Sequence, residues 1–341
     1  MKRIPSLDGL RALSIALVLY GHLQGTRYFS VPSLTVAGDY ANVGVRIFFV
    51  LSGFLITTLL LNEKARTGKI NLKAFYARRA LRILPAAYVY MLCVVAFDWK
   101  HLSGADIAVA FGYITNWVLH PPWVLGHLWS LSVEEQFYLL WPGLLLLWFR
   151  KGRRFVLFTI ACGPLVRAAL WLLKIPDAAD SYFPAVADAL ATGALLAMLQ
   201  PELRRVDRLI RSRWFLTVPV LTLLLPLLDQ HYRFYQTIGL TMLHFGIALS
   251  IQHVMVRPYS ILNGRFVVWL GVISYSLYLW QQPYLDRHST AIWSAFPINL
   301  ILAFACAAIS HYAVEKPFLR AREHWRFFES TSMDGSVLPV D

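Results

Sequence analysis

The chain has 341 residues, of which 57% are hydrophobic and only 15% are charged, whereas about a quarter of a soluble domain is charged. This composition excludes an ordinary soluble domain and predicts a polytopic membrane protein. The formal net charge of +13 does not indicate nucleic-acid binding. Its Lys and Arg residues form short blocks between apolar segments, as they do in the cytoplasmic loops of membrane proteins.

Residues 8–27 are predicted to form the first membrane helix. Lys2 and Arg3 precede it and place the N-terminus in the cytoplasm by the positive-inside rule. A cleaved signal peptide is not favoured, because the apolar stretch carries Arg11 and His22 and lacks a small-residue cleavage site. We therefore expect this helix to be retained in the mature protein.

Nine further apolar spans follow in chain order. They are predicted at 42–62, 83–99, 133–149, 155–173, 184–200, 214–228, 235–255, 266–284 and 296–314. The basic blocks at 63–82, 150–154, 202–213, 257–265 and 315–326 all fall on one side of this layout. The sequence thus predicts an all-α integral membrane protein, a bundle of about ten transmembrane helices with both termini cytoplasmic.

Residues 105–119 are apolar but do not fit the alternation of crossings, so they are predicted to be interfacial or re-entrant. Irregular backbone at membrane depth is tolerated only inside protein or beside a water-filled cavity, so this segment is a candidate wall of a site. Residues 1–326 are expected to form one transmembrane domain and 327–341 a short, disordered cytoplasmic tail. Cys93, Cys162 and Cys306 lie far apart in apolar segments and predict neither a metal site nor a disulfide framework.

The first predicted membrane helix carries the first candidate site residues. Arg11 and His22 are eleven residues apart, close to three turns, so they share one helical face with a rise of about 16 Å between them. A buried arginine is costly in a bilayer and usually faces the bundle interior or a wet cavity, and a histidine can act as acid or base near neutrality. The alternative is that Arg11 extends to the interface and His22 is hydrogen-bonded between helices.

A second candidate group is Arg78, Arg79 and Arg82, next to the third span. Arg79 and Arg82 share a helical face, and two guanidiniums at a cytoplasmic surface can bind phosphates bidentately. The alternative is that all three simply mark the cytoplasmic side.

Two more polar groups lie further along the chain. Glu134 and Glu135 open the predicted span at 133–149, where they could orient His22, bind a sugar hydroxyl, or only complement a helix N-terminus. In the last two spans, Gln281 and Gln282 precede His311 and Glu315. The last two residues are four apart and can pair.

The predicted layout places arginines at the cytoplasmic face of the membrane and a histidine with carboxylates in its outer half. This arrangement is compatible with two functions. One is a membrane enzyme that takes a phosphate-bearing donor from the cytoplasm and modifies an acceptor outside. The other is a proton-coupled transporter of a small solute or lipid-linked sugar, in which His and Glu side chains relay protons. A third possibility is a non-catalytic subunit of an envelope-assembly complex.

Six segments in order resemble the membrane-bound acyltransferase family 3. They are SLDGLRALSIALVLYGH, GVRIFFVLSGFLIT, FYARRALRILP, GHLWSLSVEEQFYLLWP, SYSLYLWQQP and VEKPF, and the resemblance covers roughly residues 4–320. It implies an enzyme of the bacterial cytoplasmic membrane. This O-acyltransferase, expected to be an O-acetyltransferase, would move an acyl group from cytoplasmic acetyl-CoA or another acyl-CoA to a hydroxyl of an envelope or exported glycan or glycolipid.

The family pattern matches this chain residue by residue. The family has a basic residue followed, after ten intervening positions, by a histidine, and Arg11 and His22 match this pattern. Arg79 and Arg82 match the arginine pair of the family. The stretch from Glu134 to Tyr138 also matches. Many members have a histidine where this chain has Gln281, so no second histidine is expected there.

The resemblance assigns expected roles. Arg79 and Arg82, with Arg78, would bind the CoA phosphates, and no metal is expected. His22 would deprotonate the acceptor hydroxyl or carry the acyl group, and Arg11 would bind the donor or stabilise negative charge. Glu135 or Glu134 would raise the basicity of His22 or position the acceptor. Larger members append a hydrolase-like domain that is not found here, so a separate envelope partner is possible.

Overall fold

The computed structural model describes residues 4–29, 37–147 and 151–321, and all the regular structure in these ranges is helical. The α-helices are α1 (Pro5–Leu23), α2 (Ala37–Thr67), α3 (Leu72–Asp98), α4 (Gly104–Phe111), α5 (Trp123–Gly126), α6 (Leu128–Leu147), α7 (Gly152–Leu172), α8 (Ala178–Ser181), α9 (Phe183–Met198), α10 (Gln200–Leu203), α11 (Asp207–Ile210), α12 (Thr217–Leu224), α13 (Tyr232–Phe234), α14 (Leu240–Val256), α15 (Arg265–Trp280) and α16 (Ile298–Ser310). Two π-helical turns, η7 (Tyr235–Gly239) and η9 (His311–Glu315), join this set.

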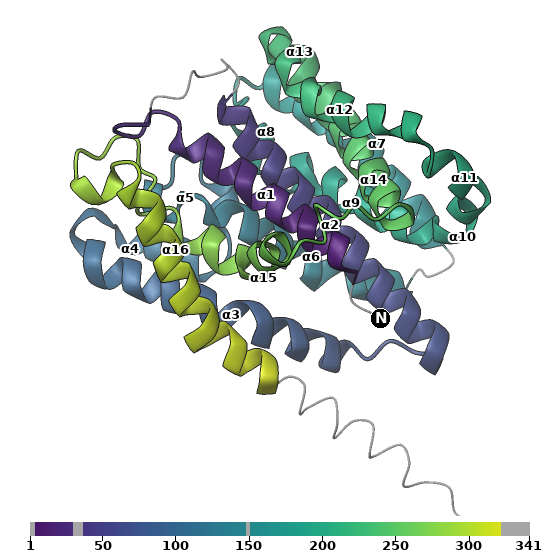
Figure 1. Ribbon diagram of the computed structural model, residues 1–341, viewed down its shortest axis with the longest axis horizontal. Helices are drawn as coiled ribbons and strands as arrows, with labels where there is room; N and C mark the ends of the chain where they lie inside the picture. The colour runs from purple at the N-terminus through teal and green to yellow at the C-terminus, as the bar shows by residue number, and fades with distance from the viewer. Residues whose placement is uncertain (1–3, 30–36, 148–150, 322–341) are drawn as a thin grey trace, which may run out of the picture.

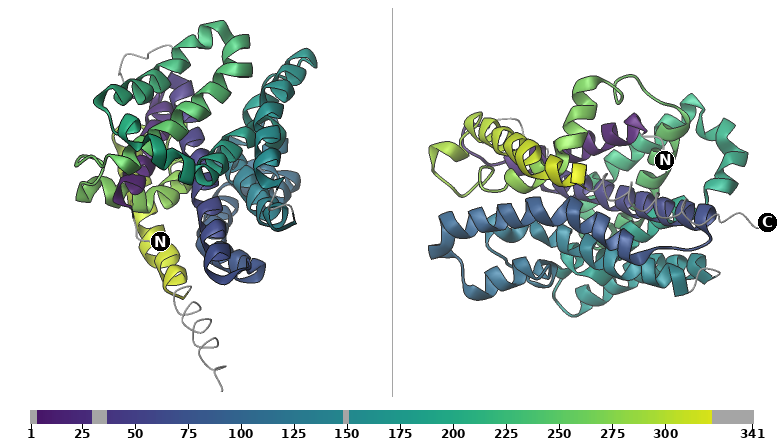
Figure 2. Two further views of the ribbon diagram at one scale, coloured as in Figure 1. Left: turned by 90° about the vertical axis from the view of Figure 1, so that its right-hand side faces the viewer. Right: turned by 90° about the horizontal axis from the view of Figure 1, so that it is seen from below.

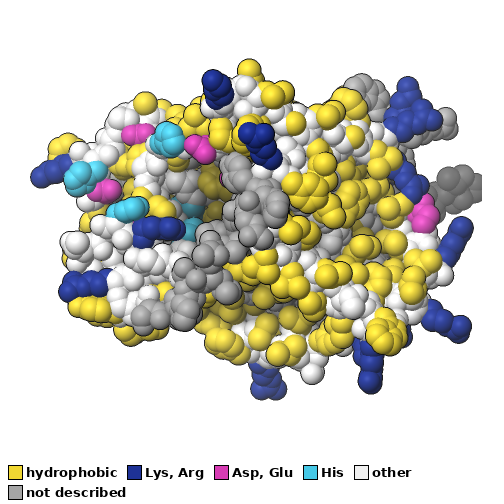
Figure 3. Space-filling view, turned by 90° about the horizontal axis from the view of Figure 1, so that it is seen from above, with side chains coloured by type: hydrophobic (Ala, Val, Ile, Leu, Met, Phe, Trp, Pro, Cys, Tyr) yellow, Lys and Arg dark blue, Asp and Glu magenta, His cyan; other side chains and the backbone are white. Residues whose placement is uncertain are grey.

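The predicted all-α membrane bundle is confirmed. Six helices in the described ranges are long and apolar enough to cross a membrane: Tyr40–Thr67, Leu72–His101, Gly152–Leu172, Ala178–Met198, Tyr235–Val256 and Ile298–Ala321. A seventh arises if Gln200–Ile210 and Arg213–Leu228, bent by 105°, form one broken span. The other predicted spans correspond to α1, α6 and α15, which are shorter or more polar. On the face in Figure 3, most charged side chains gather toward the two ends and hydrophobic ones fill the stretch between.

The centre of the bundle is formed by α1 and α2. In Figure 1, α12 and α14 lie on one flank of this pair and α3 and α16 on the other. Close packing of α2 on α9 depends on glycine. A Cβ on Gly53 would lie 1.9 Å from the Leu190 carbonyl oxygen, and one on Gly193 would lie 2.0 Å from that of Val50. Membrane helices use small residues in this way to bring their backbones together.

Helix α15 approaches α1 just as closely. A Cβ on Gly271 would lie 1.9 Å from the carbonyl oxygen of Asp8, so only glycine allows this separation. The contact matters for the site, because it brings the last turn of α1, which carries His22, next to Gln281, the residue that directly follows α15.

The basic loop predicted at 63–82 is shorter than expected, which corrects the predicted start of the third span. Helix α2 continues to Thr67, and α3 begins at Leu72, where the side chain of Asn71 accepts a hydrogen bond from the Ala74 amide. This N-cap starts the helix before the three arginines. In the right-hand view of Figure 2, α2 and α3 run along the long axis, joined by the short turn at 68–71.

Residues 105–119 form the short helix α4 and the 3-10 turn Thr115–Trp117. The predicted tail at 327–341 lies outside the described residues. The cytoplasmic position of both termini stays a prediction.

Candidate active site

Two adjacent cavities open between α1, α2, α3, α6 and α15. The first, called here the arginine cavity, has a volume of about 250 Å³. Its polar lining includes Arg11, Arg79, Arg82, Ser52 and Glu134. The second, called the histidine cavity, has a volume of about 420 Å³. Its lining includes His22, Asn42, Trp123, His127, Trp129, Asp177 and Asp180.

The arginine cavity brings together side chains from five helices, α1, α2, α3, α6 and α15. Arg11 comes from α1, whereas Arg79 and Arg82 come from the start of α3 and share one face, as predicted. The Arg79 guanidinium carbon lies 4.1 Å from the centre of the Tyr138 ring, a cation–π contact. The Nε atoms of Arg11 and Arg79 are buried and have no hydrogen-bond partner among the described residues. Buried donors without a protein acceptor are rare and are candidates for binding a ligand anion.

Glu134 lies in the same cavity and is held by two hydroxyl groups. Ser52 Oγ donates to Glu134 Oε1 over 2.7 Å, and the Tyr138 hydroxyl donates to Oε2 over 3.1 Å. Glu135 follows it on α6 but lines neither cavity, and its buried Oε1 has no hydrogen-bond partner in the described part of the chain. The structure thus places Glu134 with the arginines, while its predicted role toward His22 stays a prediction.

Arg78 is turned toward a different partner from its two neighbours. Its Nη2 lies 3.7 Å from Glu63 Oε2 near the end of α2, and it lines neither cavity. Of the three arginines proposed to bind phosphate, the structure brings Arg79 and Arg82 together with Arg11 and leaves Arg78 at the α2–α3 turn.

His22 is oriented by a chain of two side-chain amides. Its Nδ1 lies 2.8 Å from Gln281 Oε1, Gln281 Nε2 donates to Gln282 Oε1 over 2.8 Å, and Gln282 Nε2 donates to the Trp123 carbonyl oxygen over 2.9 Å. A backbone carbonyl can only accept, so it fixes the direction of the whole chain. Nδ1 of His22 therefore carries the proton, and Nε2 keeps the lone pair that a base or nucleophile needs.

The walls of the histidine cavity combine aromatic and polar groups. The rings of His22 and Trp123 meet edge to face with centroids 5.5 Å apart. Asp180 Oδ1 accepts a hydrogen bond from Asn42 Nδ2 over 3.1 Å and lies 3.6 Å from Arg46 Nη2. Val118 and Leu119, from the segment predicted to be a wall of a site, also line this cavity.

Several of these groups were not found by sequence reasoning. Trp123, Asp177 and Asp180 carry no local pattern that separates them from interfacial loop residues. A second omission is a buried ion pair, Arg167 with Asp188 at 3.1 Å. It had a sequence signal, because single charges inside apolar spans indicate a buried partner.

The predicted pairing of His311 with Glu315 is confirmed. His311 Nδ1 lies 2.9 Å from Glu315 Oε2, and Ser276 Oγ donates to the same oxygen over 3.0 Å. None of these three residues lines either cavity.

The comparison with known families defines the class of protein. The model of the acyltransferase 3 family, described as an acyltransferase domain, matches residues 4–314, so the chain belongs to this family of membrane acyltransferases. No solved structure matches the chain.

Its relatives are bacterial proteins. The chain is 31% identical to the peptidoglycan O-acetyltransferase OatA of Listeria monocytogenes, across 93% of this chain and 56% of the relative. It is 28% identical to YrhL of Bacillus subtilis, named as a candidate peptidoglycan O-acetyltransferase, across 92% of this chain and 54% of the relative. A candidate O-acetyltransferase of Staphylococcus aureus is 30% identical, across 93% and 58%. The chain therefore spans little more than half the length of these relatives.

Proposed function

We propose that the protein transfers an acyl group, most simply acetyl, from acyl-CoA bound at the arginine cavity to a hydroxyl of an envelope glycan or glycolipid in the histidine cavity. The observation that carries this proposal is the separation of two chemistries in adjoining cavities. Cationic donors surround one space, and a histidine with a defined tautomer faces the other.

The charge and the volume of the arginine cavity support its assignment as the acyl-CoA site. Arg79 and Arg82 lie in the first three turns of α3, close to the basic turn between α2 and α3, which is predicted to be cytoplasmic. Their guanidiniums suit the phosphates of CoA, because Arg binds phosphate oxygens bidentately. A cavity of about 250 Å³ accommodates the acyl and thiol end of the donor, with the nucleotide left at the mouth. Arg11, on α1, would then stabilise negative charge near the thioester.

The chemistry is assigned to His22 Nε2. As a general base, it removes the acceptor hydroxyl proton while the hydroxyl oxygen attacks the thioester carbonyl carbon. The carbon–sulfur bond breaks, and the thiolate of CoA takes the proton back from the imidazolium. As a nucleophile, Nε2 instead attacks the carbonyl carbon and expels the thiolate, which leaves an acyl-imidazolium. The acceptor hydroxyl oxygen then attacks the same carbon, the carbon–Nε2 bond breaks, and the hydroxyl proton passes to the CoA thiolate. In both routes Gln281 holds the Nδ1 proton in place.

The acceptor class follows from the histidine cavity. Trp123 and Trp129 offer flat apolar faces, and Asn42, Asp177 and Asp180 offer polar groups that suit a hydroxyl-rich sugar. The naming of a relative as a peptidoglycan O-acetyltransferase supports a glycan acceptor. Delivery of the acceptor by a separate envelope protein belongs to the same proposal.

Inside-out membrane vesicles that contain the protein test this function. Radiolabelled acetyl-CoA is added outside, and label is followed into glycan and glycolipid for the wild type, His22→Ala, Arg79→Ala and empty vesicles. At matched protein levels and limiting acetyl-CoA, we expect the highest transfer in the wild type, a large loss in His22→Ala, a smaller loss in Arg79→Ala, and no transfer in empty vesicles. Equal label in all samples would overturn the proposal, and solute uptake without acyl-CoA would favour a transporter.

A further inference from the structure

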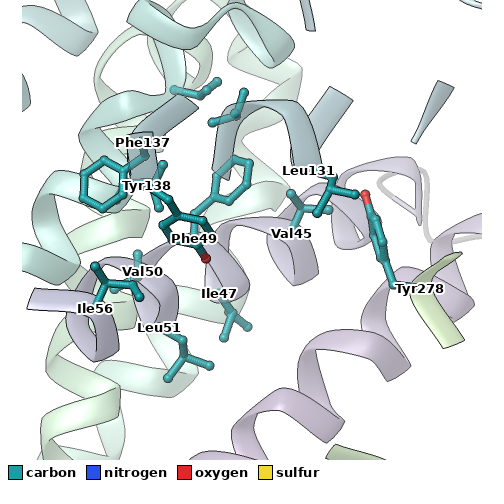
Figure 4. Packing of buried hydrophobic residues seen from close by; sticks show 14 of the residues in the cluster. Val45, Ile47, Phe49, Val50, Leu51, Ile56, Leu131, Phe137, Tyr138 and Tyr278 are labelled. Atoms are coloured by element: carbon teal, nitrogen blue, oxygen red, sulfur yellow. The ribbon is translucent and has the colours of Figure 1, made fainter. Parts of the chain in front are cut away.

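The two cavities share two lining residues, Val45 of α2 and Tyr278 of α15. Phe48 and Phe49 line the arginine cavity and not the histidine cavity, whereas Trp123 and Trp129 show the reverse. Figure 4 shows Val45 and Leu131 close to the Tyr278 ring. Any group that passes from one cavity to the other therefore passes Val45 and Tyr278.

Tyr278 is fixed in place by its hydroxyl and by its ring. The hydroxyl lies 2.5 Å from Ser130 Oγ and donates to the His127 carbonyl oxygen over 3.0 Å, which ties α15 to the start of α6. Its ring lies 5.4 Å from the His127 ring and 6.4 Å from the Phe48 ring, measured between centroids. The ring is thus held by groups from α2, α6 and the residue between α5 and α6.

Val45 completes a rigid boundary. It is buried, and a β-branched residue in a helix has one strongly preferred χ1 rotamer, so it does not move aside easily. A phenol ring held by two hydrogen bonds and a stiff branched side chain thus form the boundary shared by the two cavities.

We propose that Tyr278 and Val45 set the length of the acyl group that the enzyme transfers. This inference rests on the proposed function. The thioester carbonyl must reach the boundary from the arginine cavity to meet His22, and the carbons beyond the carbonyl then lie between Tyr278 and Val45. An acetyl group adds one methyl there, whereas a butyryl chain adds two further methylenes to a gap that its walls do not widen.

The test compares acyl-CoA donors in the vesicle assay. Transfer rates at limiting donor are measured with acetyl-, propionyl-, butyryl- and hexanoyl-CoA for the wild type, Tyr278→Ala, Tyr278→Phe and Val45→Ala. We expect Tyr278→Ala to raise the butyryl-to-acetyl ratio by about tenfold or more, since one or two methylenes in a pocket change selectivity by that order. Val45→Ala should raise it less, and Tyr278→Phe, which keeps the ring, least.

Tyr275→Ala is the matched control. Tyr275 lies on the same helix and lines the arginine cavity, but it does not line the histidine cavity. Its rate of transfer can fall, but its butyryl-to-acetyl ratio should stay that of the wild type.

The outcomes separate the two levels of proposal. If the wild type transfers acetyl and neither Tyr278→Ala nor Val45→Ala changes the butyryl-to-acetyl ratio, the proposed control of acyl length is overturned and the proposed function stands. Val45→Ala decides the matter if Tyr278→Ala fails to accumulate. If Tyr275→Ala shifts the butyryl-to-acetyl ratio as much as Tyr278→Ala does, the boundary at Tyr278 and Val45 does not set the acyl length. If the wild type transfers no acyl group from any CoA ester, the proposed function is overturned, and the proposed control of acyl length is overturned with it.

Discussion

Charged groups are buried in two regions of this bundle, and the regions treat them differently. The first is the Arg167 network of α7, α9 and α14, which consists of Arg167, Asp188, Thr241 and the carbonyl oxygens of Ala185 and Thr237. The second is the arginine cavity between α1, α2, α3, α6 and α15.

In the Arg167 network every nitrogen of the guanidinium donates a hydrogen bond. Nε donates to the Thr237 carbonyl oxygen, and Nη1 donates to the Ala185 carbonyl oxygen and to Asp188 Oδ2. Nη2 donates to Asp188 Oδ2, to the Thr237 carbonyl oxygen and to Thr241 Oγ1. Thr237 lies in the π-helical turn η7, and its carbonyl oxygen accepts two of these bonds. Side-chain exposure of Arg167 and Asp188 is 0%.

The arginine cavity shows the opposite arrangement. Arg11 and Arg79 surround open space, and each has a buried Nε without a partner in the described residues. The comparison shows that burial of charge does not by itself mark a site. A guanidinium whose nitrogens all donate to protein acceptors supports the fold, whereas guanidiniums arranged around a cavity with unused donors are available to a substrate.

The largest effect on activity is expected at the base. His22→Ala removes the group that accepts the hydroxyl proton, and general-base catalysis contributes about 10²- to 10⁴-fold. Transfer of radiolabelled acetyl should fall by that factor while the thermal stability of the purified protein stays close to that of the wild type. Undiminished transfer would show that the histidine is structural.

The largest effect on stability is expected in the Arg167 network. Asp188→Ala leaves Arg167 buried without its carboxylate, a change that costs about 3–5 kcal/mol. Thermal unfolding in detergent should show a marked loss, and the amount of protein in the membrane should fall. Asp188→Asn serves as the matched variant, because it keeps the shape and removes the charge. A fully stable Asp188→Ala would contradict the contrast between the two regions.

The donor site should show a smaller change confined to binding. Arg79→Ala removes charge-assisted hydrogen bonds worth about 1.5–3 kcal/mol, so KM for acyl-CoA should rise by about one to two orders of magnitude. The rate at saturating donor should change much less. Arg78→Ala is the control, because its guanidinium is directed at Glu63. Equal KM effects in both variants would indicate a diffuse basic surface.

The smallest of these effects is expected at Gln281, a positioning residue. Gln281→Leu removes the acceptor that holds the His22 Nδ1 proton, and loss of one such bond costs about 1–2 kcal/mol, close to tenfold in rate. KM for the donor should not change. Gln281→Glu restores an acceptor at the same position and should recover most of the rate. If Gln281→Leu and Gln281→Glu had equal activity, another group would have to hold the Nδ1 proton of His22.

Much of the fold was predictable because its signals are local. Apolar spans and basic blocks gave the bundle, and residues three or four apart gave the shared face of Arg79 and Arg82 and the His311–Glu315 pair. The start of α3 was misplaced because a run of basic residues suggests a loop, whereas the Asn71 cap begins a helix that contains them.

The site was only partly predictable, because its decisive contacts join distant segments. His22 and Gln281 are 259 positions apart, and Ser130 and Tyr278 are 148 apart. No spacing rule connects such pairs, which depend on the close packing of α1 on α15 and on the reach of the Tyr278 side chain to α6. The boundary at Tyr278 and Val45 likewise exists only once two helices have been placed around two cavities.

The central claim is that donor binding and acyl-transfer chemistry occupy different cavities. Equilibrium binding of CoA to the purified wild type, His22→Ala and Arg79→Ala in detergent tests it directly. We predict that His22→Ala binds CoA with the wild-type Kd although it transfers no acetyl, while Arg79→Ala binds at least about tenfold more weakly. Equal weakening in both variants, or wild-type binding in Arg79→Ala, would contradict the separation of the two sites.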